Sequence, residues 1–136
     1  PYYGFFRPYH LTSLEVPLTC ARIMIQGKPD MVPLPRPVAE VCAVAKRDLM
    51  PGEALDAIGE TCYRSYAMTA ADAQEKGAVP VGLLEGGKVT APVAKGELLT
   101  IANSQPDTTT RLWALRQAQD EMLGYSRPIS SASGRG

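Results

Sequence analysis

The single histidine of the chain, His10, stands close to Arg7 and Tyr9, and these three are the residues best suited to bind a substrate. An imidazole can act as a general acid or base, and a guanidinium can hold a carboxylate or phosphate through two hydrogen bonds. A phosphorylated substrate would suit this segment. In the alternative interpretation the ring nitrogens of His10 hold backbone groups and Arg7 forms an ion pair between domains. We take Arg7, Tyr9 and His10 as candidate substrate-binding residues, and the sequence designates no catalytic residue.

Two glutamates, Glu53 and Glu97, occupy equivalent places in a repeated segment and could form a symmetric pair of carboxylates. Nothing in the sequence brings them within the roughly 5 to 10 Å that carboxylate pairs use in glycosidases. Each follows a glycine, so turn structure is a sufficient explanation for both. The basic residues nearby are expected to form a solvated rim and not a phosphate cradle; they are Lys46, Arg47 and Lys95.

Cysteine chemistry has little support in this chain. Cys20, Cys42 and Cys62 are odd in number, form no C-x-x-C pair and have no neighbouring histidine. These features argue against a disulfide framework, a thiol nucleophile and a metal site. A G-x-S-x-G nucleophile motif is also absent. We therefore expect buried or incidental thiols, since free cysteine behaves as a small hydrophobe.

Charge and hydropathy exclude two classes of partner. Fourteen basic and fourteen acidic residues give the 136-residue chain a formal net charge of zero, so neither nucleic acid nor an anionic membrane surface is expected. No apolar run approaches the roughly 20 residues of a membrane helix, and the first residues lack the basic-then-apolar order of a signal peptide. We predict a soluble, cytoplasmic protein. The start at Pro1 and the aromatic residues of the first ten positions suggest a piece of a longer chain, packed there against a neighbouring surface.

Several elements are expected to position these residues. Residues 1–10 have strand propensity, and a helix should begin at Pro17 after a single turn at 12–15. An alternative start is a capping box formed by Thr12 and Glu15, and Gly27 should end the helix. Residues 28–37 hold four prolines and should form a stiff connector.

The remainder of the chain alternates strand and helix signals. Extended runs are expected at 41–44 and 89–93, and a hairpin is expected where 79–84 and 88–91 flank Glu85-Gly86-Gly87. A short helix over 69–77 has a Thr cap and a closing Gly. A second, amphipathic helix over 107–123 is capped by Asp107 or one of the threonines at 108–110, with Leu112, Leu115 and Met122 on one face.

One segment of the sequence occurs twice. Residues 48–56 recur 44 positions later as residues 92–100, with the apolar, Gly-Glu and Leu positions in register. Such self-similarity indicates two copies of one supersecondary unit. We therefore expect a compact β unit in which the two copies are related by a pseudo-two-fold axis.

The repeated segment resembles the SAF domain, a family with the β-clip fold. The resemblance covers residues 38–104, where both copies carry the Gly-Glu-x-Leu core. Flanking residues extend the resemblance to the C-terminal end of NAD(P)-dependent oxidoreductases similar to homoserine dehydrogenase, including enzymes resembling 1-deoxyxylulose-phosphate reductoisomerase in activity. These flanking residues are 7–11, 14–15, 21–22, 37–41, 45–49 and 112–124. In that group a Rossmann domain and a catalytic, oligomerising domain precede the SAF-like domain.

The resemblance implies a fold, a cofactor and partners. The fold class is mainly β (α+β), a β-clip SAF domain with flanking N-terminal and C-terminal helices. Domains are expected at 1–37 (tail of a catalytic domain), 38–104 (SAF-like), 105–124 (helix) and 125–136 (disordered tail). NAD(P) is implied for the parent chain and none for this fragment, which lacks the G-x-G-x-x-G fingerprint.

Two functions remain open at this point. In the first, the chain is an accessory domain of such an oxidoreductase, which covers the active-site cleft or pairs subunits into a homo-oligomer and is not catalytic alone. In the second, it is a free-standing SAF binding module for a sugar acid or a protein partner. Residues 1–37 favour the first, because the second leaves them without a use.

Overall fold

The computed structural model describes residues 4, 6–29 and 32–125. The chain divides into two compact units, Pro1–Pro35 and Arg36–Gly136, each of which is described by itself. Of the predicted tail at 125–136, only Tyr125 lies among the described residues. The aromatic residues Tyr2, Tyr3 and Phe5 also lie outside them.

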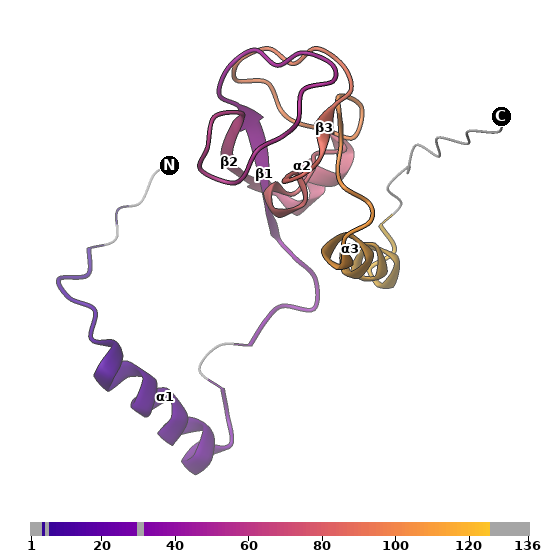
Figure 1. Ribbon diagram of the computed structural model, residues 1–136. Helices are drawn as coiled ribbons and strands as arrows, with labels where there is room; N and C mark the ends of the chain where they lie inside the picture. Colours follow the sequence, from indigo (N-terminus) through magenta and orange to yellow (C-terminus); the bar gives the residue numbers. More distant parts are fainter. Residues whose placement is uncertain (1–3, 5, 30–31, 126–136) are drawn as a thin grey trace. The chain divides into compact units, whose positions relative to one another are not determined.

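The described residues of the first unit form one helix, α1, which spans Thr12–Gln26 (Figure 1). Its start differs from both predicted starts, because the helix is continuous through Pro17 and has no side-chain cap. The carbonyl of Leu11 accepts hydrogen bonds from the amides of Leu14 and Glu15, at 3.0 and 2.9 Å, so the first turn is complete before the proline. Gly27 ends the helix as predicted, with φ of 64° and its amide donating to Ile23.

The strand predicted over residues 1–10 is not found in the described residues of that range, 4 and 6–10. A strand requires a partner for its backbone groups, and unit 1 offers none among its described residues. Strand propensity alone was therefore a poor guide. The described residues of the connector, 28, 29 and 32–37, form neither helix nor strand, as the prolines predict.

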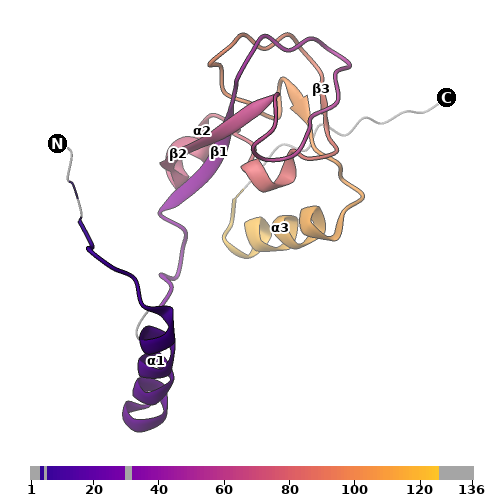
Figure 2. The same ribbon diagram turned by 60° about the vertical axis from the view of Figure 1, so that its left-hand side comes forward.

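The second unit is an α+β structure, which confirms the coarse fold class. Strands β1 (Ala39–Ala45) and β2 (Tyr63–Thr69) form one antiparallel pair, and β3 (Lys88–Val89) and β4 (Ser104–Gln105) form another (Figure 2). The predicted extended run at 41–44 lies inside β1. The run at 89–93 is confirmed only at its start, since β3 ends at Val89 and residues 90–92 belong to no strand.

The repeat folds about a pseudo-two-fold relation, as predicted. Leu49 and Val93, which are equivalent positions of the two copies, pair with each other through both backbone hydrogen bonds, at 2.8 and 3.0 Å. Two equivalent residues can exchange both bonds only near the axis that relates the copies. This pairing therefore lies at the centre of the unit.

The bonds around that centre also occur in equivalent pairs. The amide of Gly52 donates to Val89 while the amide of Val89 donates to the carbonyl of Glu53, both at 2.9 Å. Forty-four positions away along the repeat, Gly96 donates to Ala45 at 2.8 Å and Ala45 donates to Glu97 at 2.9 Å. Gly52 and Gly96 share a positive φ, 92° and 85°, which glycine adopts without strain.

The hairpin predicted around residues 85–87 is wrong. Val81–Leu83 forms a 3₁₀ turn, η1, and β3 pairs with β4. The turn itself does form, since the amide of Gly87 donates to Leu84 at 2.9 Å. It is held by another segment, however, because Leu55 donates to Gly87 and accepts from Gly86. The local sequence predicted the turn at Gly87 correctly, but the distant residue Leu55 determines which segment the turn pairs with.

Both helices predicted in unit 2 are present. Helix α2 spans Ala70–Glu75, with Thr69 Oγ1 accepting from the amide of Asp72 at 3.0 Å. Helix α3 spans Arg111–Met122 and is capped by Thr110. Its core-facing apolar residue is Trp113. The stripe predicted on one face is exposed, with Leu112, Leu115 and Met122 showing 54, 58 and 87% of their surface.

The main hydrophobic core contains side chains from both repeat copies, from β1 and β2, and from residues 79–89. It comprises these largest fully buried apolar side chains: Leu49, Tyr63, Val79, Leu84, Val89, Val93 and Leu99. Cys42 and Cys62 are buried, as the sequence predicts for small hydrophobic side chains, whereas Cys20 is exposed.

Candidate functional site

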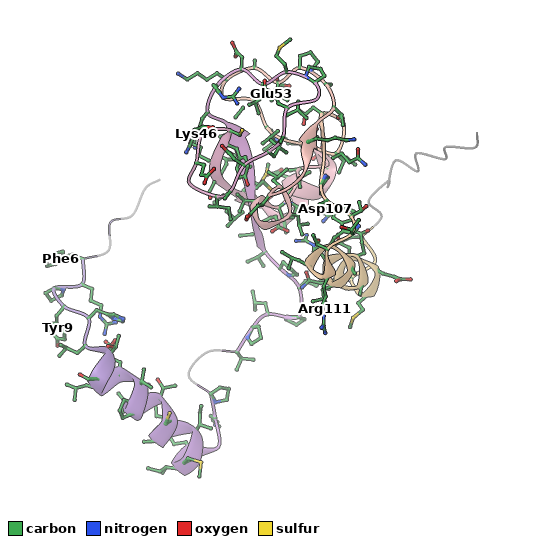
Figure 3. The ribbon with its side chains drawn as sticks, in the orientation of Figure 1. Phe6, Tyr9, Lys46, Glu53, Asp107 and Arg111 are labelled. Atoms are coloured by element: carbon green, nitrogen blue, oxygen red, sulfur yellow. The ribbon has the colours of Figure 1, made fainter. Side chains whose placement is uncertain are left out.

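The three predicted substrate-binding residues lie together, and Glu15 joins them. Arg7 forms an ion pair with Glu15, and His10 Nδ1 lies 2.8 Å from the same carboxylate. The guanidinium Nε of Arg7 also donates to the carbonyl of Tyr9 at 3.0 Å. Tyr9 projects from the segment that precedes α1 (Figure 3). Glu15, which the capping-box alternative assigned to the backbone, is occupied by these side chains.

This cluster is open to solvent. The side chains of Arg7 and His10 are 65 and 69% exposed, and that of Glu15 is 30% exposed. Exposed ion pairs contribute about 0 to 1 kcal/mol, so Glu15 holds these two side chains only weakly. An incoming phosphate would have to replace a carboxylate that is already in place. The assignment of Arg7, Tyr9 and His10 to substrate binding stays a prediction.

The two equivalent glutamates of the repeat, Glu53 and Glu97, each accept a backbone hydrogen bond within their own turn. Glu53 accepts from the amide of Met50 at 2.7 Å, and Glu97 accepts from the amide of Ala94 at 2.8 Å. Each carboxylate thus satisfies a backbone donor three residues earlier. The two-carboxylate alternative has no support in this geometry, whereas the turn explanation accounts for both side chains.

The basic rim near Glu53 is engaged in internal contacts. Arg47 Nη2 lies 2.7 Å from the Glu53 carboxylate and 3.6 Å from Cys62 Sγ. The hydrogen bond with Arg47, together with the Met50 amide, lowers the pKa of Glu53. Lys46 Nζ donates to the carbonyls of Gly59, at 3.2 Å, and Glu60. Figure 3 shows Lys46 and Glu53 on the unit that carries the repeat.

Asp56 organises the loop that leads into β2, a role that sequence reasoning missed. Its carboxylate accepts from the Thr61 amide at 2.8 Å, the Thr61 hydroxyl at 2.7 Å and the Cys62 amide at 3.1 Å. Burial raises the pKa of Asp56, but the Thr61 and Cys62 donors outweigh it and lower the value to about 2. Tyr63 donates its hydroxyl to the Asp56 carbonyl, and burial, followed by the Asp56 charge, raises the pKa of Tyr63 to about 12.

A second charged group ties α3 to β1. Arg116 Nη2 lies 2.6 Å from Glu40, and Arg116 Nε donates to Asp120 Oδ1 at 2.8 Å. The three side chains are at most 17% exposed. Burial lowers the pKa of Arg116, but hydrogen bonds to Glu40 and Asp120 outweigh it and raise the value. The spacing of Arg116 and Asp120 on a helix could have indicated their contact, whereas nothing in the sequence indicated Glu40.

A shallow hollow of about 350 Å³ lies beside this ion cluster, between η1 and α3. Its wall is mostly apolar, and Leu112 and Leu115 of the exposed stripe form part of it. Arg116 supplies the charged part of the wall. These lining residues include no nucleophile, general base or metal ligand, so the hollow suits the binding of an apolar side chain and not catalysis. The full lining is Pro80, Gly82, Leu83, Leu112, Leu115, Arg116 and Gln119.

Comparison with known proteins adds no family to this description. No family model matches the sequence, and no curated protein matches it. In the described part of the chain no three His, Cys, Asp or Glu side chains gather where they could hold a metal ion. The helices among these residues are all too short or too polar to cross a membrane.

Proposed function

We propose that this chain is the C-terminal accessory domain of an NAD(P)-dependent oxidoreductase similar to homoserine dehydrogenase, with a SAF-like β-clip at residues 38–104. In this role it supports the active-site cleft or the pairing of subunits and performs no chemistry alone. A Rossmann domain and a catalytic domain would precede it in the parent chain. NAD(P) would bind to those domains, since this chain carries no dinucleotide fingerprint.

The observation that carries the proposal is that unit 1 offers α1 no surface to pack against among its described residues. This 15-residue helix has no buried residue, and its own unit leaves several of its large apolar side chains uncovered. The most exposed are Leu14, Val16, Met24 and Ile25. Helices of this length are marginal in water without tertiary packing. A preceding catalytic domain would supply the surface that α1 requires.

The geometry of the repeat supports the SAF-like part of the proposal. The Leu49–Val93 pairing and the equivalent bonds at Gly52 and Gly96 describe a folded ribbon whose two halves repeat one another. The resemblance of residues 48–56 and 92–100 to that family rests on the same turns. The turn glycines and glutamates are accounted for by this architecture alone, which leaves no catalytic role to assign to them.

The mass of the native protein tests the proposal. An antibody raised against this chain should detect, in its source cells, a species larger than 14.6 kDa by one or two domains of about 100 to 200 residues each. That species should turn over NADH or NADPH, and the 136-residue chain alone should not. A native species of 14.6 kDa would overturn the proposal and favour the free-standing binding module, with the hollow beside α3 as its first candidate site.

A further inference from the structure

The outer edge of β2 has backbone groups that no other described element of unit 2 binds. On the far side of β1, Ala43 accepts from Leu99, and Ala45 donates to Glu97 and accepts from Gly96. Backbone groups alternate in direction along a strand. Because the backbone groups of Ala43 and Ala45 point away from β2, those of Cys42 and Val44 point toward it, and they face their register partners Tyr66 and Arg64. On β2, the backbone groups of Ser65 and Ala67 consequently point away from β1.

The side chains along this edge leave room for another strand. Ser65 and Ala67 are small and exposed. Arg64 Nη1 donates a long hydrogen bond of 3.4 Å to the outward carbonyl of Ser65. Among the described residues, no other hydrogen bond reaches the outward backbone groups of Ser65 and Ala67. Natural edge strands commonly carry prolines, charged side chains or a bulge that discourages pairing. Residues 63–69 contain no proline, their one charged residue is Arg64, and their register with β1 is unbroken.

We propose that two copies of this chain pair through their β2 edges, antiparallel, about a two-fold axis at Tyr66. In this register Ser65 of one copy faces Ala67 of the other, and the two residues exchange both backbone hydrogen bonds. Four intermolecular bonds result from the two symmetric pairs. The two Tyr66 residues then form the non-hydrogen-bonded pair, in which cross-strand side chains lie closest. Figure 2 shows β2 as the strand next to β1 in its two-stranded sheet.

Self-complementarity favours a second copy as the occupant. Tyr66 is 46% exposed, and an aromatic pair across the axis would cover part of that surface. Arg64 carries the one formal charge of β2 and would face Met68 of the second copy, which keeps the two guanidinium groups out of direct opposition. The formal net charge of the chain is zero, so long-range repulsion does not oppose association. The proposal does not depend on the proposed function.

Sedimentation equilibrium and amide hydrogen exchange test this pairing on the intact 136-residue chain. We expect a concentration-dependent dimer in which the amides of Ser65 and Ala67 are protected and lose that protection on dilution. The amides of Arg64 and Tyr66 provide an internal control, because they bond to β1 in monomer and dimer alike. A protein that stays monomeric at all concentrations overturns the proposal. So does a dimer whose Ser65 and Ala67 amides exchange freely, or protection of these amides in a monomer, which would mean that a segment of the same chain covers the edge.

Three substitutions distinguish an effect at the β2 edge from general effects on the protein surface. Ala67→Lys places a charge on the edge and should raise the dimer dissociation constant about tenfold or more. Ala114→Lys makes the same change at an exposed position of α3 and should leave it unchanged. Ala67→Pro provides a second variant, since it removes an outward amide without removing a bond to β1. Retained protection at Tyr66 shows that each variant is folded, and a folded Ala67 variant that dimerises like the native chain contradicts the proposal.

Discussion

Leu49 and Val93 occupy equivalent positions of a repeated segment, and each donates its backbone amide to the carbonyl of the other. Both side chains are 1% exposed. The pair therefore joins the two copies through backbone bonds and through the core at the same point. A sequence repeat of only nine residues can build a common core in this way, because each copy supplies the hydrogen-bonding partner that the other lacks.

Acid should destabilise the protein through Asp56. Because its folded pKa is lowered to about 2 while the unfolded value is near 4, its stabilising contribution is complete above about pH 4 and is lost as the pH falls toward 2. We expect the free energy of unfolding to fall by about 1 kcal/mol through Asp56, after allowance for solvent screening. Urea unfolding at pH 7, 4 and 2.5 measures this change.

Asp56→Asn is the matched control for that experiment. The pKa values of Glu53 and Asp107 are also lowered, so the native protein contains several acid-sensitive groups. The difference between native and Asp56→Asn unfolding free energies isolates Asp56, and it should shrink between pH 4 and 2.5. A difference that stays constant over this range would contradict the role given to Asp56.

The sequence was informative wherever structure depends on neighbouring residues. Thr69, Asp72 and Gly77 lie within nine positions and specify the start and end of α2 without help from elsewhere. The start of α1 was missed although it is local, because Glu15 contacts Arg7 and His10 and does not cap the helix. In the hairpin region the turn at Gly87 was correct, but Leu55 decided which segment it pairs with.

The missed parts of the candidate sites depend on distant residues. Arg116 meets Glu40 from 76 positions away, and no pattern in the sequence relates them. The exposure of the apolar stripe on α3 also depends on a contact with distant residues. Trp113 reaches the core, so the helix turns Leu112 and Leu115 toward the hollow beside η1. Periodicity predicted an apolar face correctly, but it could not predict what that face contacts.

Replacing Arg116 should destabilise unit 2. Arg116→Met leaves the carboxylates of Glu40 and Asp120 without their guanidinium, and Asp120 has only 4% of its side chain exposed. Breaking a buried ion pair from one side costs about 3 kcal/mol. Urea unfolding measures this loss. Arg111→Met provides the control, because Arg111 is exposed at the start of the same helix (Figure 3) and its loss should change stability little.

Removing the uncompensated carboxylates tests whether charge causes the instability of Arg116→Met. Glu40→Gln and Asp120→Asn, added to Arg116→Met, remove the carboxylates that the first substitution left uncompensated. We expect the triple variant to regain part of the lost stability. If it is less stable than Arg116→Met alone, then packing of the long arginine side chain, and not charge, accounts for the effect.

Gly87 should tolerate no side chain. A Cβ at this position would lie 2.6 Å from the carbonyl oxygen of Gln105 and 3.0 Å from that of Leu84, both of which belong to the backbone. Because backbone cannot move aside as a flexible side chain can, Gly87→Ala should cost about 2 to 3 kcal/mol. Gly82→Ala is the control, since its Cβ would meet no atom within 4 Å. Equal stability of the two variants would mean that the β3–β4 region can shift to accommodate a methyl group.

Removing the proline from α1 should strengthen this helix. Pro17 lies inside Thr12–Gln26 and cannot donate the backbone hydrogen bond that a helix interior uses. A proline in a helix interior costs about 3 kcal/mol relative to alanine, and no buried residue of α1 compensates for it. Pro17→Ala should therefore raise the helical content of residues 12–26, measured by Cα chemical shifts. Pro29→Ala, in the connector, should leave those shifts unchanged. If Pro17→Ala also leaves them unchanged, then α1 is already held by a surface outside its own unit.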